Sequence, residues 1–141
     1  MSIQAKKLNY TYQIGTPLEH TGSGKSTLLQ HLNGLLKPTS GEISINGYTI
    51  DNTTKNKELG KLRKEVGFVF QFPERQLFAQ TVRDDLAFGP QNLGWSQKKI
   101  NKSIMKALET VQLSPTILKQ SPFSLSGGQK RRVAIAGVLA M

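Results

Sequence analysis

The sequence contains no cysteine and only two histidines, His20 and His31. Disulfide bonds and thiolate metal sites are therefore excluded, and a zinc site is not expected. No apolar run approaches the ~18 residues that a membrane-spanning helix needs. The first seven residues also lack the apolar stretch of a signal peptide. These absences predict a cytosolic chain, and its length of 141 residues suits one domain.

Acidic residues are scarce as well, since nine Asp and Glu stand against nineteen Lys and Arg, giving a formal charge of +10. Such an excess of positive charge is typical of proteins that bind nucleic acid or an anionic membrane surface, and it also occurs on a surface that is simply solvated. The lysines gather in a polar connector around residues 55–64 and on the polar side of a helix predicted after Ser96. No aromatic residues are interleaved with them, as a base-stacking surface requires. The distribution favours a solvated exterior, with no nucleic-acid partner.

Strands are predicted in three places. Loose alternation from Ile3 to Ile14 predicts one or two strands of an antiparallel layer. Residues 42–50 predict a hairpin, because Asn46-Gly47 is the dipeptide that tight hairpin turns favour. The apolar run 66–70 predicts a strand buried on both faces. That strand would deliver Gln71 at its C-terminal end, where open α/β sheets bind ligands.

Helices are predicted from apolar spacing and capping residues. A leucine-striped helix begins at Lys25 and stops before Lys37-Pro38. Thr81 begins a capping box before a short helix through about Phe88, which Gly89-Pro90 ends. Ser96 caps a longer helix with one apolar stripe. After Gly127-Gly128 the residues are apolar all round, as in a helix buried inside a larger body.

The segment Gly22-Ser23-Gly24-Lys25-Ser26-Thr27 has the form of the end of a phosphate-binding loop. In such a loop, backbone N–H groups and the positive end of the next helix face the anion, so glycines stand where side chains would block it. The motif implies that Lys25 reaches the β- and γ-phosphates and that Ser26 holds Mg²⁺. The alternative is a Gly-Ser turn that merely starts a helix. It is disfavoured because the leucine-striped helix begins where a phosphate site requires it.

The loop is incomplete at its start. Glu19 stands where the motif has its first glycine. A carboxylate at ~5 Å from the phosphates, with an effective dielectric near 20, costs on the order of 3 kcal/mol, or about two powers of ten in affinity. The loop should also follow a buried strand, but residues 15–20 form a turn sequence with no apolar run. We hypothesise that a segment with that strand and glycine is absent between about His20 and Thr21.

A second motif is the segment 125–132, Leu-Ser-Gly-Gly-Gln-Lys-Arg-Arg. Ser126 is placed to cap the following helix, so its hydroxyl and the amides of Gly127 and Gly128 form an anion site at the helix's positive end. Nothing on its own chain is expected to fill that site. The alternative is simply a capped, buried helix.

These two motifs, with Gln71 between them, resemble the nucleotide-binding subunits of ATP-binding cassette (ABC) transporters. Residues 71–78 and 88–92 resemble importers of the energy-coupling-factor (ECF) and cobalt type. The resemblance implies an α/β fold, a P-loop NTPase with an ABC-type ATP-binding domain. Its parts would be a β layer and P-loop core over 1–73, a helical subdomain over 74–120, and the signature motif with its helix over 121–141.

The resemblance also implies ligands and partners. Gln71 would sense Mg²⁺ and the attacking water, and Ser26 and Gln71 would form the metal site. Tyr12 would stack on adenine, although two tyrosines covering a sheet explain it nearly as well. The phosphate loop would contact ATP, and the signature motif would contact the ATP of the opposing subunit in a head-to-tail dimer. The residues that would contact ATP are Tyr12, Thr21, Gly22, Ser23, Gly24, Lys25, Ser26, Thr27, Ser126, Gly127, Gly128 and Gln129.

The implied assembly is a homo- or heterodimer of ATP-binding subunits on a transmembrane ECF subunit, at the cytoplasmic face of the membrane, that imports a vitamin or metal ion. The family follows its signature helix with an Asp, a catalytic Glu and a switch His, which these residues do not include. We therefore expect no useful ATP hydrolysis by this chain. The alternatives are a soluble ABC ATPase acting on nucleic acid or ribosomes, and a non-functional truncated remnant.

We predict that the chain is poorly stable in isolation, because several core strands of the family's domain are missing from the sequence. Circular dichroism during heating should show a broad loss of signal without a cooperative transition. A sharp transition together with native-like near-UV dichroism would contradict this prediction.

Overall fold

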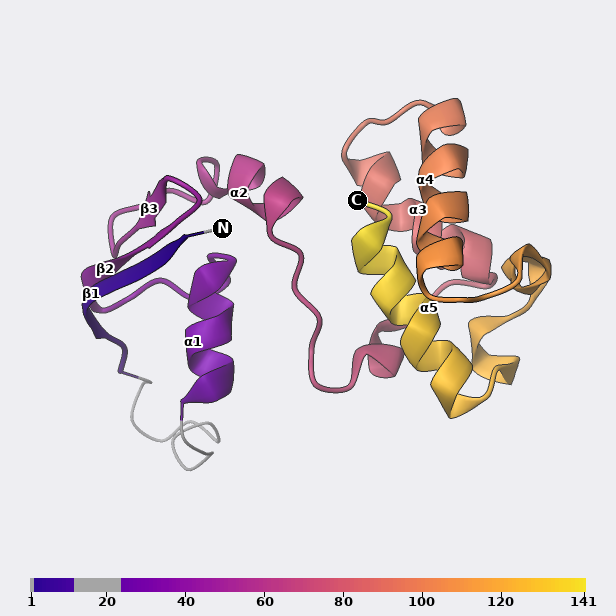
Figure 1. Cartoon of the computed structure of the whole chain (residues 1–141), viewed down its shortest axis with the longest axis horizontal. Coiled ribbons are helices and arrows are strands. Elements are labelled where there is room, and N and C mark those ends of the chain that lie inside the picture. Colours follow the sequence, from indigo (N-terminus) through magenta and orange to yellow (C-terminus); the bar gives the residue numbers. More distant parts are fainter. Residues whose placement is uncertain (1, 12–23) are drawn as a thin grey trace. The chain divides into compact units, whose positions relative to one another are not determined.

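The computed structural model describes residues 2–11 and 24–141 (Figure 1). The chain divides into two compact units, Met1–Phe68 and Val69–Met141, and each is considered by itself. Among the helices of the described residues, none combines the length and apolar character needed to span a bilayer.

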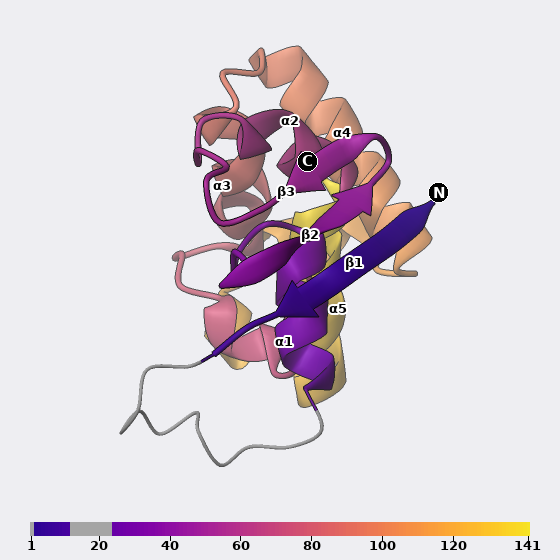
Figure 2. The same cartoon turned by 90° about the vertical axis from the view of Figure 1, so that its left-hand side faces the viewer.

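The first unit is built on a three-stranded antiparallel sheet, in the order β1-β2-β3, and the second view shows the strands side by side (Figure 2). The strands are β1 (Ile3–Asn9), β2 (Ser40–Ile45) and β3 (Tyr48–Ile50). The turn between β2 and β3 places Asn46 at φ 48° and Gly47 at φ 82°, the left-handed pair that a tight hairpin needs. The predicted hairpin is therefore confirmed, as is an antiparallel strand over Ile3–Asn9, while residues 12–14 of the predicted layer lie outside the described residues.

Two helices complete this unit, α1 (Lys25–Leu32) and α2 (Leu59–Glu65). Its small core consists of alternate β2 and β3 residues and two leucines of α2, and all of them are buried: Ile43, Ile45, Ile50, Leu59 and Leu62. The alternation arises because successive residues of a strand point to opposite faces of the sheet.

The prediction that α1 continues to the residue before Lys37 was wrong, since the helix ends at Leu32. Gly34 adopts φ +69°, and its N–H donates to the His31 carbonyl at 3.0 Å. The Arg63 guanidinium of α2 donates to the carbonyl oxygens of Asn33 at 3.4 Å and Gly34 at 2.8 Å. The left-handed Gly34 and the Arg63 side chain provide hydrogen-bond partners for the backbone at the end of α1. The helix therefore ends about one turn earlier than the leucine spacing predicts.

The predicted strand over residues 66–70 was also wrong. Val66 is extended, with φ −116° and ψ 91°, but none of residues 66–70 belongs to the sheet. Val69 lies exposed in this segment. A strand requires a neighbour for its N–H and C=O groups, and the sheet formed by the described residues pairs only β1, β2 and β3. Gln71 therefore follows an irregular segment rather than a buried strand.

The second unit is helical. Its elements are η1 (Pro73–Gln76), α3 (Val82–Asn92), α4 (Gln97–Thr110), η2 (Pro115–Lys119), η3 (Pro122–Ser124) and α5 (Gly127–Leu139). The helices α3, α4 and α5 pack against one another in all three pairs. Each helix contributes apolar residues from one side to the core that they enclose. Thr81 accepts from the Asp84 N–H at 3.2 Å and Ser96 from the Lys99 N–H at 3.4 Å, so both predicted N-caps are confirmed.

Two helical predictions in this unit were wrong. First, α3 continues through Gly89-Pro90 to Asn92. Pro90 removes one helical hydrogen bond, but the residue is buried, and Gly94, two residues beyond the end of the helix, adopts φ +70°. Second, α5 is not buried all round, because α3 and α4 cover one side and Leu139 stays half exposed.

We predict that Leu108→Ala destabilises the helical unit by about 2–5 kcal/mol, because Leu108 is fully buried between the helices and its removal leaves a cavity. Native-state amide hydrogen exchange in α3, α4 and α5 measures the change as the free energy of opening of this unit, which requires no cooperative transition of the whole chain. The matched control is Lys106→Ala, an exposed position on the same helix, for which a change within about 0.5 kcal/mol is expected. Equal effects of the two substitutions would show that α4 does not bury its apolar stripe.

Candidate nucleotide-binding site

The first turn of α1 has the backbone form of an anion site. Gly24 is the N-cap, with φ 77° and ψ 0°, and no side chain caps the helix. A Cβ on Gly24 would meet nothing within 4 Å, so glycine is favoured there by its conformation rather than by crowding. Lys25 and Ser26 follow and are exposed. A helix N-terminus without a side-chain cap and with an adjacent lysine is suited to a phosphate group.

The rest of the predicted phosphate loop (Thr21, Gly22 and Ser23) and the predicted adenine contact (Tyr12) lie outside the described residues, as does Glu19. Gly24, Lys25, Ser26 and Thr27 are brought together at the start of α1 by their succession along one helical turn.

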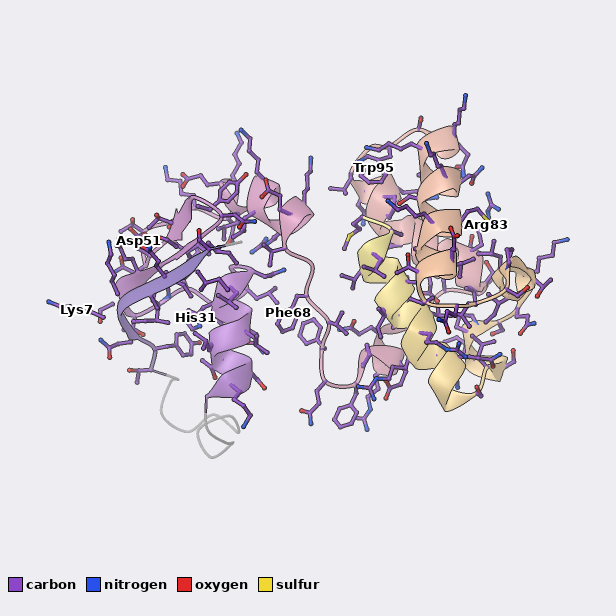
Figure 3. The ribbon with its side chains drawn as sticks, viewed as in Figure 1. Lys7, His31, Asp51, Phe68, Arg83 and Trp95 are labelled. Atoms are coloured by element: carbon purple, nitrogen blue, oxygen red, sulfur yellow. The ribbon has the colours of Figure 1, made fainter. Side chains whose placement is uncertain are left out.

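A buried histidine supports this turn, and the sequence analysis missed its role. His31 is only 1% exposed, and its Nδ1 lies 2.7 Å from the Thr27 carbonyl oxygen, one helical turn before it. Its ring meets the Tyr10 ring edge to face at 5.0 Å, which ties α1 to the segment after β1. Figure 3 shows His31 on the side of α1 that faces the sheet. The i, i+4 spacing of Thr27 and His31 was the available signal.

Gln71 belongs to the second unit, where it is exposed two residues before the start of η1. The next residues carry a cation–π contact, with the Arg75 guanidinium carbon 4.8 Å from the centre of the Phe72 ring. Gln71 and Ser26, the two predicted metal contacts, thus lie in different units. No group of three or more His, Cys, Asp or Glu residues suited to a metal exists within the part of the chain that the structure describes.

The signature segment starts α5 as predicted. Ser126 Oγ accepts from the Gln129 N–H at 3.3 Å, and Gln129 Oε1 accepts from the Ser126 N–H at 3.0 Å. This reciprocal capping box fixes the first turn. Ser126, Gly127 and Gly128 are exposed, and a Cβ on either glycine would meet nothing within 4 Å. The second unit therefore leaves the space in front of this helix end open.

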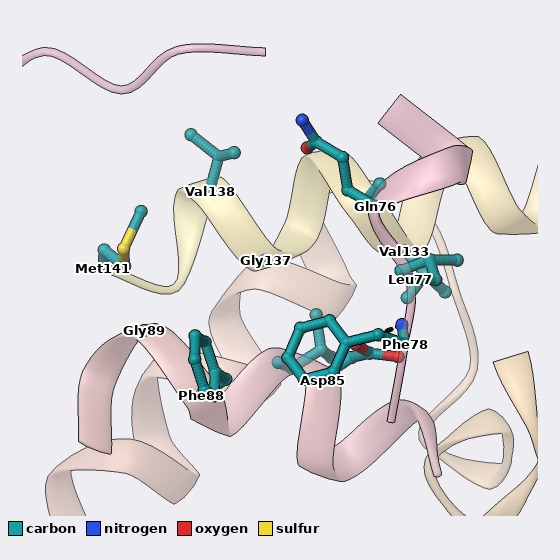
Figure 4. A pocket seen from close by; sticks show the side chains of 12 residues that line it. Gln76, Leu77, Phe78, Asp85, Phe88, Gly89, Val133, Gly137, Val138 and Met141 are labelled. Atoms are coloured by element: carbon teal, nitrogen blue, oxygen red, sulfur yellow. Dashed lines mark hydrogen bonds between the residues drawn. The ribbon is translucent and has the colours of Figure 1, made fainter. Parts of the chain in front are cut away.

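A hollow of about 160 Å³ lies in the second unit, and we call it the α3–α5 hollow (Figure 4). Phe78 and Phe88 form its rim, with their rings edge to face at 5.0 Å. Asp85 Oδ1 accepts from the N–H groups of Phe78 at 3.2 Å and Ala79 at 3.3 Å, which holds the rim in place. Most of the other lining is apolar, from Leu77, Leu86, Val133, Ala134, Val138 and Met141.

Two clear pKa shifts lie away from these sites. The Asp51 carboxylate accepts hydrogen bonds from the hydroxyl and backbone groups of Thr53 and Thr54, which lowers its pKa. The Tyr48 hydroxyl donates to Glu65 at 3.0 Å, which raises the pKa of Tyr48. The Asp51 interactions lie in the connector after β3, and the Tyr48–Glu65 hydrogen bond links β3 to the end of α2, so neither involves the candidate phosphate turn.

The family follows from a profile match. The profile of the ABC transporter family matches residues 18–141. The chain belongs to the ABC transporter family. The match spans the candidate turn at α1, Gln71 and the signature segment. The predicted fold class, an α/β P-loop NTPase of the ABC type, is thereby confirmed.

Curated relatives indicate which type of ABC subunit the chain resembles. The chain is 67% identical over 162 aligned positions to the energy-coupling factor transporter ATP-binding protein EcfA2 of Ligilactobacillus salivarius (strain UCC118), covering 100% of this chain and 56% of that protein. It is 55% identical over 141 positions to EcfA2 of Lactococcus lactis subsp. cremoris (strain MG1363), covering 100% and 48%. The resemblance to energy-coupling-factor ATPases is confirmed, and the chain spans about half the length of these curated relatives.

Solved ABC structures have the same fold. The cbiO1 protein of Clostridium perfringens, described as part of the ABC transporter complex cbiONQ, matches with a TM-score of 0.78 at 37% identity, over 98% of this chain and 61% of that one. The dimeric ABC cassette MJ0796 matches with a TM-score of 0.80 at 30% identity, over 99% and 69%.

We predict that Ser126→Ala destabilises the helical unit by about 1 kcal/mol, because the first turn of α5 loses its side-chain cap. Native-state amide hydrogen exchange in α5 measures the loss as a change in the free energy of opening of this helix. The matched variant Ser126→Asp keeps an acceptor at the N-cap, and its negative charge suits the helix's positive end, so its stability should stay near that of the unmodified chain. A loss with aspartate as large as that with alanine would mean that the cap does not stabilise α5.

Proposed function

We propose that this chain is the ATP-binding portion of a subunit of an energy-coupling-factor importer, which couples ATP binding and hydrolysis to the uptake of a vitamin or metal ion. The observation that carries the proposal is that one chain of the ABC family has two separate helix N-termini of the kind that suits an anion, one at Gly24-Lys25 and one at Ser126. The relatives named EcfA2 support the importer type.

The residues at the start of α1 fit the end of a triphosphate and its Mg²⁺. Lys25 would bind the β- and γ-phosphates, while the hydroxyl of Ser26 and, from the second unit, Gln71 would hold the metal. ATP supplies the phosphoryl group whose transfer drives the transport cycle. Thr21, Gly22, Ser23, Gly24 and Thr27 would complete the phosphate contacts, and Tyr12 would stack on adenine.

The signature motif is proposed to act on the nucleotide of a second ATP-binding subunit. Ser126, Gly127, Gly128 and Gln129 would contact that ATP in a head-to-tail dimer. The open space in front of the two glycines supports this role, because their lack of side chains serves no packing within the second unit. The dimeric form of MJ0796 supports the assembly.

A transmembrane subunit is the second proposed partner, with this chain at the cytoplasmic face of the membrane. The segment after Gln71 and the rim of the α3–α5 hollow expose Phe72, Phe78 and Phe88, which offer an apolar surface to a helix of that subunit. We keep the division proposed from the sequence, with a P-loop core over 1–73, a helical subdomain over 74–120 and the signature segment over 121–141.

We further propose that residues 1–141 alone do not hydrolyse ATP at a useful rate, since the carboxylates that activate water in the family are not among them. A soluble ABC ATPase acting on nucleic acid or ribosomes is the alternative that the charge of +10 favours. A non-functional remnant is the other alternative. Salt-dependent binding to duplex DNA would support the first of these.

We predict that millimolar Mg-ATP raises the temperature at which the first unit unfolds, and that Lys25→Ala removes the increase. A ligand that binds only the folded state stabilises that state, and Lys25 supplies the nearest positive charge at the start of α1. Differential scanning fluorimetry measures the shift.

The matched control is Lys61→Ala, which removes the same charge from an exposed position on α2 and should leave the ATP-dependent shift intact. An ATP-dependent shift that survives Lys25→Ala would place the nucleotide elsewhere. No shift in the unmodified chain, combined with tight salt-dependent DNA binding, would favour the nucleic-acid alternative.

A further inference from the structure

The outer side of α4 carries a row of exposed lysines, which we call the α4 lysine face. Its members recur three or four residues apart, so they share one side of the helix. They are Lys98, Lys99, Lys102 and Lys106. The opposite side of α4 packs into the core of the second unit through Ile100, Ile104, Ala107 and Leu108. The lysines therefore point away from the core.

An arginine of α3 lies at the edge of this face. The exposed Arg83 guanidinium donates to Asn101 Oδ1 at 2.6 Å, and Gln97 Nε2 donates to the same oxygen at 3.0 Å. Asn101 lies three positions after Lys98, one turn along α4. Arg83 is thus held beside the lysine row and adds a fifth positive charge.

Little negative charge balances the α4 lysine face. Glu109 is the one acidic residue of α4. It lies three positions after Lys106, but the two side chains form no ion pair. Lys98 and Lys102 form none either with any residue that the structure describes. These charges are therefore available to an anion outside the chain.

The charges of α4 also stand where they weaken the helix. Lys98 and Lys99 lie in the first turn, at the positive end of the helix dipole, and Glu109 lies in the last turn, at the negative end. Lysines four positions apart, such as Lys98 and Lys102, repel each other. A face that served only solubility would be more stable with both signs interspersed. An anionic surface placed against the lysines would relieve this repulsion.

Apolar groups beside the lysines indicate the kind of anionic surface. A hollow opens next to Lys102 and Lys106, and its other lining residues are Met105, Leu108, Glu109, Leu113 and Pro115. Met105 is 46% exposed. Lysine side chains that rise from apolar surface and carry their charge at the tip suit the boundary between lipid headgroups and hydrocarbon.

Nucleic acid fits this face less well. The sequence of α4 contains no aromatic residue that could stack on bases. Trp95, just before the helix, packs partly against the core, and the Lys99 ammonium lies 3.4 Å from the centre of its ring. The indole is therefore already engaged within the second unit.

We propose that the α4 lysine face binds the surface of an anionic phospholipid bilayer. The lysines contact lipid phosphate groups, as clustered lysines do at negatively charged membranes, and Met105 lies against the apolar boundary below them. Because α4 keeps its apolar stripe in the protein core, the contact stays at the level of the headgroups. The proposal goes beyond the proposed function, since the contact involves neither ATP nor a transmembrane subunit.

The test measures binding of the chain to lipid vesicles by flotation. We expect binding to vesicles of phosphatidylglycerol mixed with phosphatidylcholine and none to phosphatidylcholine alone. The triple variant Lys98→Gln, Lys102→Gln and Lys106→Gln should bind the anionic vesicles about 100-fold more weakly, because each lysine near such a surface contributes several-fold in affinity. Raising the salt from about 0.1 M to about 1 M should release the unmodified chain, since the screening length falls from roughly 10 Å to roughly 3 Å.

Two matched variants show whether the position of the charge matters. Lys55→Gln, Lys57→Gln and Lys61→Gln together remove the same charge from exposed positions of the first unit and should leave vesicle binding nearly unchanged. Replacing the three α4 lysines by arginine keeps the charge and should retain binding. Equal losses from the two glutamine triples would mean that only the net charge acts, and would overturn the proposal.

Other outcomes also decide the proposal. Equal binding to phosphatidylcholine alone, or loss of binding in the arginine variant, would overturn it. Duplex DNA that binds more tightly than the anionic vesicles, through the same three lysines, would assign the face to nucleic acid instead.

Amide hydrogen exchange in α4 separates loss of binding from loss of structure. The glutamine triple of α4 should exchange more slowly than the unmodified chain, because the repulsion between lysines is gone. If it exchanges faster, the single variants Lys98→Gln, Lys102→Gln and Lys106→Gln take its place. Each should then weaken vesicle binding about fivefold, and no effect from any of them would overturn the proposal.

Discussion

The pairing requirement of the peptide backbone governs the first unit. Each N–H and C=O group in a strand must find a partner, and β1, β2 and β3 satisfy this through two antiparallel ladders. The ladders place Ile43, Ile45 and Ile50 on one face, where α2 adds Leu59 and Leu62. The run 66–70 has an equally apolar sequence but no place in these ladders, and it therefore remains outside the sheet.

The features that sequence predicted well are those decided within a few residues. The caps at Thr81, Ser96 and Ser126 follow from side-chain oxygens that reach N–H groups three positions ahead. The Asn46-Gly47 turn follows from the left-handed conformation that these two residues tolerate. Such interactions need no distant partner, so a pattern of five or six residues contains all the information required.

The features that sequence predicted poorly depend on groups far along the chain. The end of α1 is satisfied by Arg63, about thirty positions away. The passage of α3 through Pro90 depends on burial of that residue within the second unit. At the candidate site, the start of α1 and the cap of α5 could be predicted. The spacing of Thr27 and His31 was visible in the sequence, but the contact of His31 with Tyr10, in the segment after β1, was not.

The capping box at α5 has a consequence for binding energetics. Ser126 and Gln129 hold each other through two hydrogen bonds within the first turn. The first turn is therefore preorganised, because few of its rotatable bonds are left to be fixed when a ligand binds. In the head-to-tail dimer proposed above, little conformational entropy would be lost at this surface, so we expect even a brief encounter between two subunits to form the contact in its final geometry.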